Sequence, residues 1–304
     1  MDRIQTNFVT LIFIGAVVLF SLCMAPLTSY AKEKGVQNST PSDASAKEDL
    51  GEISRQLENP LTSLWSLTFE DSVLLKEGDA INGTELANTL FFQPGLPIPV
   101  GEKKDKVFIA RPVFPLVTNP VLDPTATDDV DGHETGFGDI QFLTLLGPNR
   151  TSGIVWGAGA TFKFPTATDD VLGEGKYQAG PAAMFFRLAK PWTVGFLYQH
   201  WWSYAGDDDR SDTNQTDLKY IIRYSLPDAW SIGMGPTVTV DWEADSENRW
   251  TVPVGLGVTK MVRFGKMPVK FIVEVQYSVI RPEDYGTQWK FLFRFAPVIP
   301  SPFR

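Results

Sequence analysis

In several segments of this sequence, charged and polar side chains occupy positions that alternate with apolar ones. Lys290 and Arg294 are two of them. They alternate with Trp289, Phe291 and Phe293. Because successive side chains of a β-strand point to opposite faces, this pattern places the charges on one face and the rings on the other. If the apolar faces contact lipid, the opposite faces enclose water, and their chemistry is the selection of a solute.

The residues predicted to line such a lumen share this position opposite an apolar row. They are Asp139, Gln141, Lys163, Gln199, Asp217, Lys219, Arg223, Asp241, Arg249, Lys270, Glu274, Gln276, Lys290 and Arg294. Charges that face each other across a narrow barrel can select a solute, or they can pair and close the lumen. The sequence leaves both alternatives open.

A hydrolase would need a nucleophile that a base activates, and the chain has only two histidines. His133 lies in an acidic segment, and His200 precedes Ser203 by three positions. Residues at this spacing point to opposite faces of a strand, so His200 and Ser203 cannot pair directly. We expect His200 to belong to an aromatic belt with Trp201 and Trp202, and we predict that the protein is not an enzyme and needs no cofactor.

A short acidic sequence, Pro-Thr-Ala-Thr-Asp-Asp-Val, occurs twice in predicted loops. Its acidic pairs are Asp128 with Asp129 and Asp169 with Asp170. Calcium takes about six to eight oxygen ligands, so these loops are a weak candidate for a metal site. Because the spacing matches no EF-hand loop, the alternative is a solvated acidic surface that divalent ions bridge to lipopolysaccharide.

The N-terminal residues 1–31 have the features of a secretory signal peptide. An apolar run over residues 8–24, with the small residues Ser29 and Ala31 behind it, predicts cleavage before Lys32. The alternative is a retained membrane anchor. Export through a signal peptide would carry the mature chain out of the cytoplasm.

Residues 32–60 are expected to form a periplasmic linker and a short amphipathic helix. The first part of this range is polar and charged, which is typical of a flexible linker. Leu50, Ile53 and Leu57 follow at spacings of three and four, which predicts one or two helical turns. The simpler interpretation is a helix packed on the mouth of a barrel, and the alternative is a plug.

Residues 61–304 are predicted to form the barrel, because alternation continues through about twelve segments. We place strands near 64–75, 88–98, 106–114, 136–146, 152–164, 177–189, 192–204, 215–226, 230–242, 249–260, 267–278 and 285–296. Ordinary strands have about five or six residues, whereas a tilted membrane strand needs about nine to eleven. Most of these segments are long enough to be tilted membrane strands.

Aromatic residues and linkers support the same interpretation. The apolar rows begin or end at aromatic residues such as Trp192, Trp202, Trp230 and Trp242, as membrane barrels do at the two headgroup levels. Short turns alternate with longer acidic loops, which is what an up-and-down barrel requires. We therefore predict an all-β fold, a single antiparallel transmembrane barrel of about twelve strands.

The composition excludes other classes of protein. A net charge of −9 argues against a nucleic-acid partner. No stretch after the N-terminal run approaches about 18 apolar residues, so helices of the mature chain cannot span a bilayer. The single cysteine, Cys23, lies in the predicted signal peptide, which leaves the mature chain without a disulfide or a cysteine metal site.

An ordered series of short motifs resembles a known family. The series includes Gly136–Ile140, Gly157–Asp170, Leu172–Ala183, Gln199–Gly206, Arg249–Gly257 and Arg281–Tyr285. It is similar to the outer-membrane proteins grouped with the meta-pathway of phenol degradation, which are often called only transporters and sometimes neuromedin U. The resemblance covers most of the mature chain. It implies a barrel in the outer membrane of a Gram-negative bacterium that takes up small molecules, some of them hydrophobic or aromatic.

These observations predict an outer-membrane channel through which a small-molecule solute passes down its gradient. Its other partners would be outer-membrane lipids, lipopolysaccharide and the barrel-assembly machinery. The alternative is a non-transporting surface barrel whose acidic loops bind cations, lipopolysaccharide or partner molecules.

Overall fold

The computed structural model describes residues 43–59, 62, 64–122 and 130–301. The predicted signal peptide and residues 32–42 of the predicted linker lie outside this part of the chain. The chain divides into two units, residues 1–49 and 50–304, and each is described by itself. Helix α2 (Asp43–Gln56) crosses this boundary. No helix in the described ranges is both long enough and apolar enough to cross a membrane.

Almost all of the second unit is antiparallel β-sheet. Its described strands are β1 (Trp65–Glu77), β2 (Glu85–Val100), β3 (Lys106–Leu122), β4 (Val130–Phe137), β5 (Ile140–Pro148), β6 (Gly153–Phe164), β7 (Lys176–Ala189), β8 (Trp192–Gly206), β9 (Asn214–Ser225), β10 (Trp230–Met234), β11 (Thr237–Asp241), β12 (Trp250–Phe264), β13 (Met267–Ile280) and β14 (Gly286–Ile299).

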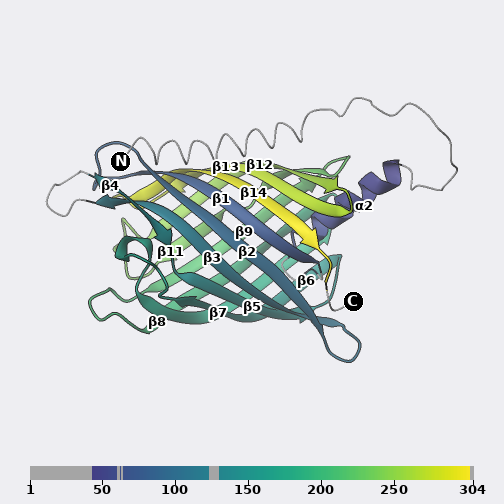
Figure 1. Ribbon diagram of the computed structural model, residues 1–304, viewed down its shortest axis with the longest axis horizontal. Coiled ribbons are helices and arrows are strands. Elements are labelled where there is room, and N and C mark those ends of the chain that lie inside the picture. The colour runs from purple at the N-terminus through teal and green to yellow at the C-terminus, as the bar shows by residue number, and fades with distance from the viewer. Residues whose placement is uncertain (1–42, 60–61, 63, 123–129, 302–304) are drawn as a thin grey trace. The chain divides into compact units, whose positions relative to one another are not determined.

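These strands close into a barrel, as the alternation predicted. Except for β4 with β5 and β10 with β11, strands that follow each other in the sequence pair, and β1 pairs with β14 to join the two ends of the sheet. β4 and β5 both pair with β3, and β10 and β11 both pair with β9 and β12, so each of these couples forms one interrupted strand of the wall. The wall therefore has twelve strands, and Figure 1 shows β1 beside β14 at its closure.

Proline explains one of the two interruptions. Between β10 and β11 lies Pro236, which has no N–H to donate to a neighbouring strand. Its carbonyl still accepts a hydrogen bond from the Tyr220 N–H at 3.1 Å, so the wall stays closed across the break.

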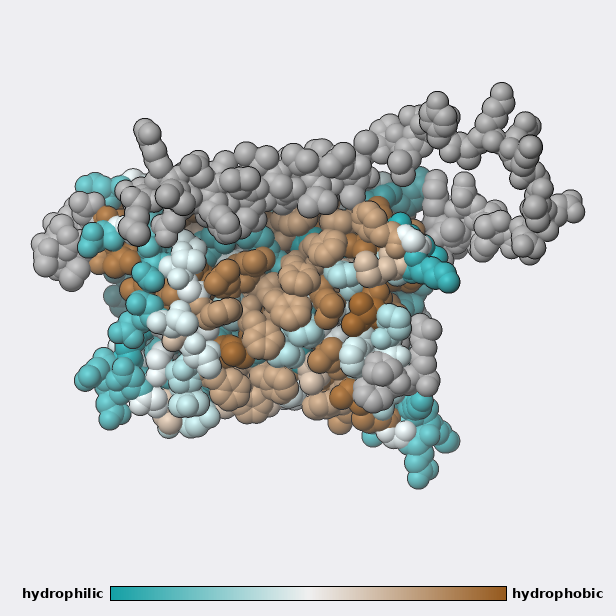
Figure 2. Space-filling view, in the orientation of Figure 1, coloured by the Kyte–Doolittle hydropathy of each residue, from teal (hydrophilic) through white to brown (hydrophobic). Residues whose placement is uncertain are grey.

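The outer surface of the wall is apolar. In β12 the side chains of Val254, Leu256 and Val258 are exposed, by 64% for Leu256. Their neighbours on the opposite face, Thr259 and Met261, are buried. Figure 2 shows apolar residues across the middle of the wall and hydrophilic residues towards its ends. The apolar rows of the sequence therefore face outwards.

Exposed aromatic residues lie at both ends of this apolar band. At one end the ring of Trp192 packs against Tyr224, with centroids 5.0 Å apart. At the other end Trp242 packs against Trp250, with centroids 6.3 Å apart. Two such rims are typical of a barrel whose band contacts a bilayer.

The connections differ in length at the two ends of the barrel. We call one the turn end, where residues 101–105, 149–152, 190–191, 226–229 and 265–266 connect the strands. We call the other the loop end, where the connections are 78–84, 123–129, 165–175, 207–213, 242–249 and 281–285. In bacterial outer-membrane barrels the short turns face the periplasm and the longer loops face the outside.

Two elements extend beyond their predicted bounds. Helix α2 begins at Asp43, before the apolar spacing starts, because residues 43–49 include types of high helix propensity such as alanine, lysine and glutamate. β3 and β4 form a hairpin through part of a predicted long loop, where Thr118 is opposite Thr135 and their hydroxyls lie 2.9 Å apart. The prolines of this segment each remove only their own N–H, so the ladder continues around them.

Because the outer face of the wall is apolar and the inner face carries polar side chains, a new charge should destabilise the protein more on the outer face. A Leu256→Lys substitution should lower the free energy of unfolding by about 2–4 kcal/mol if the residue lies near the bilayer midplane, because the ammonium would face acyl chains. Thr251→Lys, in the same strand but facing the lumen, should change it far less. Urea unfolding of both variants in lipid vesicles measures the difference. Equal destabilisation would contradict the assignment of the two faces.

Candidate functional site

The lumen contains a cavity of about 310 Å³ in the half nearer the loop end. Six of the predicted lumen residues line it: Gln141, Gln199, Asp217, Lys219, Gln276 and Lys290. Hydroxyl side chains of β11, β12 and β14 add further polar groups, and leucine, valine and phenylalanine side chains add apolar ones. The cavity therefore has the size and mixed lining of a small-molecule site.

A second, smaller cavity of about 110 Å³ lies nearer the turn end. Its lining shares Gln93, Arg111, Leu197 and Lys219 with that of the first cavity. These shared side chains separate the two spaces at mid-height of the barrel, so a solute that crossed the lumen would have to pass them.

Five charged side chains gather at this level, and we call them the central charge cluster: Glu70, Arg111, Lys219, Lys290 and Arg294. Arg294 donates to one carboxylate oxygen of Glu70 through both Nε, at 2.8 Å, and Nη2. Lys219 and Lys290 also act electrostatically on Glu70. The like charges of Arg111 and Arg294 repel the charge of Lys219. Four cations thus surround one carboxylate.

Two members of the central charge cluster are absent from the predicted lumen set. Glu70 has Asp71 beside it, which hides the alternation of its strand. Arg111 follows Val107 and Ile109, which share its face and are both buried, so that face also looks apolar in the sequence. The signal that could have identified Glu70 is its position next to Phe69. Because Phe69 points outwards and neighbouring side chains of a strand point to opposite faces, Glu70 must point inwards.

A second set of charges closes the turn end, and we call it the mouth network: Glu58, Arg223, Lys270 and Glu274. Lys270 donates to Glu58, and Arg223 Nε lies 3.3 Å from Glu58 Oε1. Arg223 Nη2 donates to Glu274 at 3.0 Å. All four side chains are at most 6% exposed. With two cations and two carboxylates the network is neutral, which suits its burial.

Glu58 belongs to the segment that follows α2, so the mouth network ties this segment to the wall. Burial raises the pKa of Glu58, but the attraction of Lys270 and Arg223 is stronger and brings it down from 4.5 to about 2. Because the pKa is lowered, this interaction stabilises the docked segment at neutral pH. The contribution is lost only as the pH falls from about 4.5 towards 2.

Further hydrogen bonds hold residues 50–59, which we call the plug segment, at the turn end. Arg55 donates to the Thr151 carbonyl at 3.3 Å, and Asn59 donates to the Arg150 carbonyl at 3.2 Å. Lys270 donates to the Ser54 carbonyl at 3.1 Å. Glu58 and Asn59 also line the smaller cavity. These contacts agree with both alternatives of the sequence, a helix packed on the mouth and a plug.

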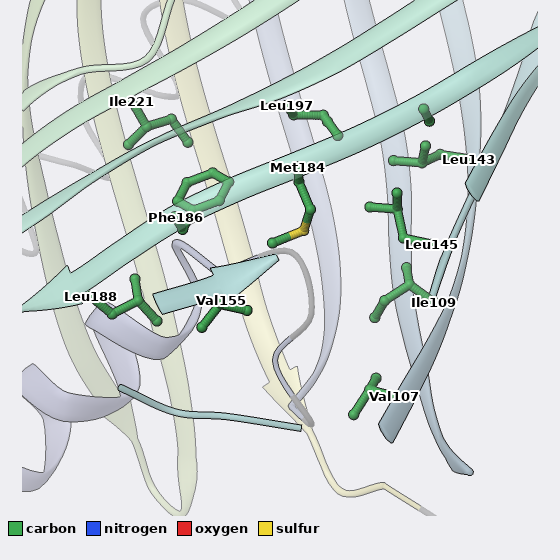
Figure 3. Packing of buried hydrophobic residues seen from close by; sticks show 11 residues of the cluster. Val107, Ile109, Leu143, Leu145, Val155, Met184, Phe186, Leu188, Leu197 and Ile221 are labelled. Atoms are coloured by element: carbon green, nitrogen blue, oxygen red, sulfur yellow. The ribbon is translucent and has the colours of Figure 1, made fainter. Parts of the chain in front are cut away.

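The inner wall near the turn end is apolar, which the sequence did not predict. A buried cluster on β3, β5, β6, β7, β8 and β9 consists of Val107, Ile109, Leu143, Leu145, Val155, Ala182, Met184, Phe186, Leu188, Leu197 and Ile221. Figure 3 shows these side chains gathered on the inner side of the strands. Phe186, Leu197 and Ile221 line the smaller cavity with Leu57 of the plug segment. The apolar cluster therefore gives the plug segment a dry surface to pack on.

Several predicted lumen residues hold the loop end instead of lining a cavity. Asp139 accepts hydrogen bonds from the Thr166, Ala167 and Glu174 N–H groups at 2.7–3.1 Å, so it fixes the loop between β6 and β7. Lys163 is buried and lies 3.2 Å from Glu174. Asp139 thus has its partners in a loop, whereas Lys163 also donates to Gln215 of β9 at 3.3 Å.

Asp241 and Arg249 also serve the loop between β11 and β12. Asp241 accepts from the Glu243 N–H at 3.0 Å, and Arg249 Nη2 donates to the Ala244 carbonyl at 3.0 Å. Neither residue lines either lumen cavity. Asp241 is the last residue of β11 and Arg249 directly precedes β12, so both bind the loop that connects these strands.

The acidic loops offer no assembled metal site among the described residues. Asp169 accepts from the Val171 N–H at 3.1 Å and caps the 3-10 helix η1 (Asp170–Leu172). No group of three or more histidine, cysteine or carboxylate side chains in the described ranges could hold an ion. Asp128 and Asp129 lie outside the described residues. In the described part the acidic pair thus has a structural role.

His200 lies among aromatic side chains on β8. Its ring centroid is 4.0 Å from that of Trp202, and its Nδ1 is 2.6 Å from the Thr216 hydroxyl. Ser203 instead donates to Asp212 at 3.1 Å. His200 and Ser203 therefore have different partners, as the strand spacing predicted.

Solved structures resemble this fold. An outer-membrane channel from Pseudomonas putida F1 aligns with a TM-score of 0.58 at 13% identity, over 78% of this chain and 94% of that one. The β domain of the Bordetella autotransporter BrkA gives 0.43 at 10% identity, over 78% and 100% of the chains. The monoaromatic hydrocarbon channel CymD gives 0.36 at 10% identity, over 89% and 96%. No family model and no curated protein sequence matches the chain. At these identities the likeness to the Pseudomonas channel shows the fold.

The mouth network predicts how the plug segment responds to the loss of one carboxylate. Glu58→Gln leaves Lys270 and Arg223 with too little negative charge, which should weaken docking by about 3–5 kcal/mol. Glu52→Gln is the matched control, since Glu52 is one-third exposed and its ion pairs are worth about 1 kcal/mol or less. Hydrogen exchange of residues 50–59 at neutral pH measures docking. Equal protection in both variants would show that Glu58 is not the anchor.

Proposed function

We propose that this protein is an outer-membrane channel through which small molecules pass down their concentration gradient. The observation that carries the proposal is a closed twelve-stranded wall that encloses two cavities in series, with charged side chains between them. An apolar outer band with two aromatic rims supports a place in the bilayer. The resemblance of the sequence to outer-membrane transporters agrees with this function.

The described conformation is a closed one under this proposal. The plug segment lies in the turn-end mouth, where Glu58 pairs with Lys270 and Arg223. Passage would require the plug segment to shift, and the neutral mouth network would then lose one carboxylate. The energy of that step makes the mouth a gate that opens seldom in the absence of a solute.

The cavity lining supports small solutes with an apolar part. Apolar side chains such as Phe91, Leu143 and Leu197 share the larger cavity with amides and hydroxyls. A cavity near 310 Å³ is at the small end of the range for drug-sized ligands. Lipids and lipopolysaccharide would surround the wall, and the barrel-assembly machinery would insert it.

Conductance through planar bilayers tests the proposal. The wild-type chain should give rare, small current steps, because the plug segment closes the mouth. A chain that lacks residues 43–59, or one with Glu58→Gln, should stay open for longer and conduct more current. Glu52→Gln should behave like the wild type.

The opposite result would favour a different class of protein. If both the wild-type chain and the chain without residues 43–59 insert and stay silent, the protein is a non-transporting barrel. Insertion can be confirmed separately by protection of the wall from protease.

A further inference from the structure

We propose that the larger lumen cavity binds small organic carboxylates, with the anion held by the central charge cluster and the apolar body on the leucine, valine and phenylalanine side chains of the same cavity. The inference names a substrate class for the lumen and so rests on the proposed channel function. It starts from an imbalance of charge: four cations of the cluster face a single carboxylate, Glu70.

The ion pairs of the cluster show which of its cations have a carboxylate partner. Glu70 is bound to Arg294 through two nitrogen atoms. Lys219 and Lys290 make no ion pair within 4.0 Å with any residue of the described ranges. The other carboxylate of the cavity, Asp217, accepts hydrogen bonds from the neutral groups of Gln215 and Thr239 at 2.8 and 2.9 Å and keeps its negative charge. The four cations of the cluster therefore exceed the two carboxylates, Glu70 and Asp217, by two positive charges.

Arg111 supplies a donor that is still free. Its Nη2 donates to Gln93 at 3.1 Å, whereas its buried Nε has no hydrogen-bond partner in the described structure. A buried donor without a partner costs free energy, and a guanidinium is suited to hold a carboxylate. Because Arg111 lines both cavities, an anion beside it would lie between them.

The same cavity has an apolar side that an inorganic anion would not use. Leu74 and Phe91 lie on β1 and β2, and Val113, Leu143 and Leu197 lie on β3, β5 and β8. A solute with a carboxylate at one end and a ring or short chain at the other could contact both surfaces. The neutral mouth network contrasts with this cavity, because its cations already have carboxylate partners.

Calorimetric titration of the purified full-length chain in detergent, at low ionic strength, tests the inference with sodium benzoate as the probe. We expect saturable binding by the wild-type chain. Arg111→Gln and Lys219→Gln should each weaken it by about tenfold or more, the loss expected for a hydrogen bond to a charged group. Lys219→Arg should retain binding, and Lys103→Gln, an exposed lysine of the turn between β2 and β3, should bind like the wild type.

One further variant is expected to strengthen benzoate binding, a result that misfolding cannot produce. Glu70→Gln removes the carboxylate that competes for the cations and should strengthen benzoate binding. A folded Glu70→Gln barrel that binds no better than wild type would contradict the role of the central charge cluster. Folding of each variant can be checked by its faster migration on gels before heating.

Two analogues of benzoate test the anionic part and the apolar part of the inference separately. Sodium acetate, which lacks the ring, and benzyl alcohol, which lacks the charge, should each bind more weakly than benzoate. Acetate that binds as tightly as benzoate would overturn the apolar part, and benzyl alcohol that binds as tightly would overturn the anionic part. Benzoate binding in a silent barrel would refute only the channel function, and conductance without benzoate binding would refute only this site.

Discussion

The need to neutralise charge inside a narrow barrel organises this structure. Inward side chains are partly removed from water, so a buried cation without a counter-charge is costly. At the turn end the chain meets this need by placing Glu58 of the plug segment against Arg223 and Lys270. At mid-height it meets the need only in part, with Glu70 beside Arg294. The two levels of the lumen therefore differ in how complete their pairing is.

This difference connects the fold with the proposed function. A neutral, buried network at the mouth favours a closed state, because opening separates charges that would then lack partners. An incompletely neutralised cluster above it favours the entry of an anion. Under the proposed function the barrel would have a gate and a binding level along one axis, and both would depend on the charges of inward residues.

The apolar inner cluster gives the plug segment its second support. Most inner faces of membrane barrels are polar, whereas Val155, Phe186 and Leu188 here point inwards and are buried. Apolar burial adds a contribution to docking that does not depend on salt. The mouth network adds attraction between opposite charges and fixes the position of the plug segment. Neither contribution follows from the alternation of one strand, because each needs residues from opposite sides of the wall.

The sequence alone determined the elements of the wall. Period-two alternation, aromatic rims and the alternation of short and long connections are local signals, so twelve strands and the outward face could be predicted from segments such as β12 and β14. The same alternation assigned Gln199, Lys219 and Lys290 to the inner face, and all three line the larger cavity. Tertiary structure decided which of these charges meet. Glu58 and Lys270 are 212 positions apart, and Glu70 and Arg294 are 224 positions apart. Their pairing depends on the closure and stagger of the barrel, which no local pattern records.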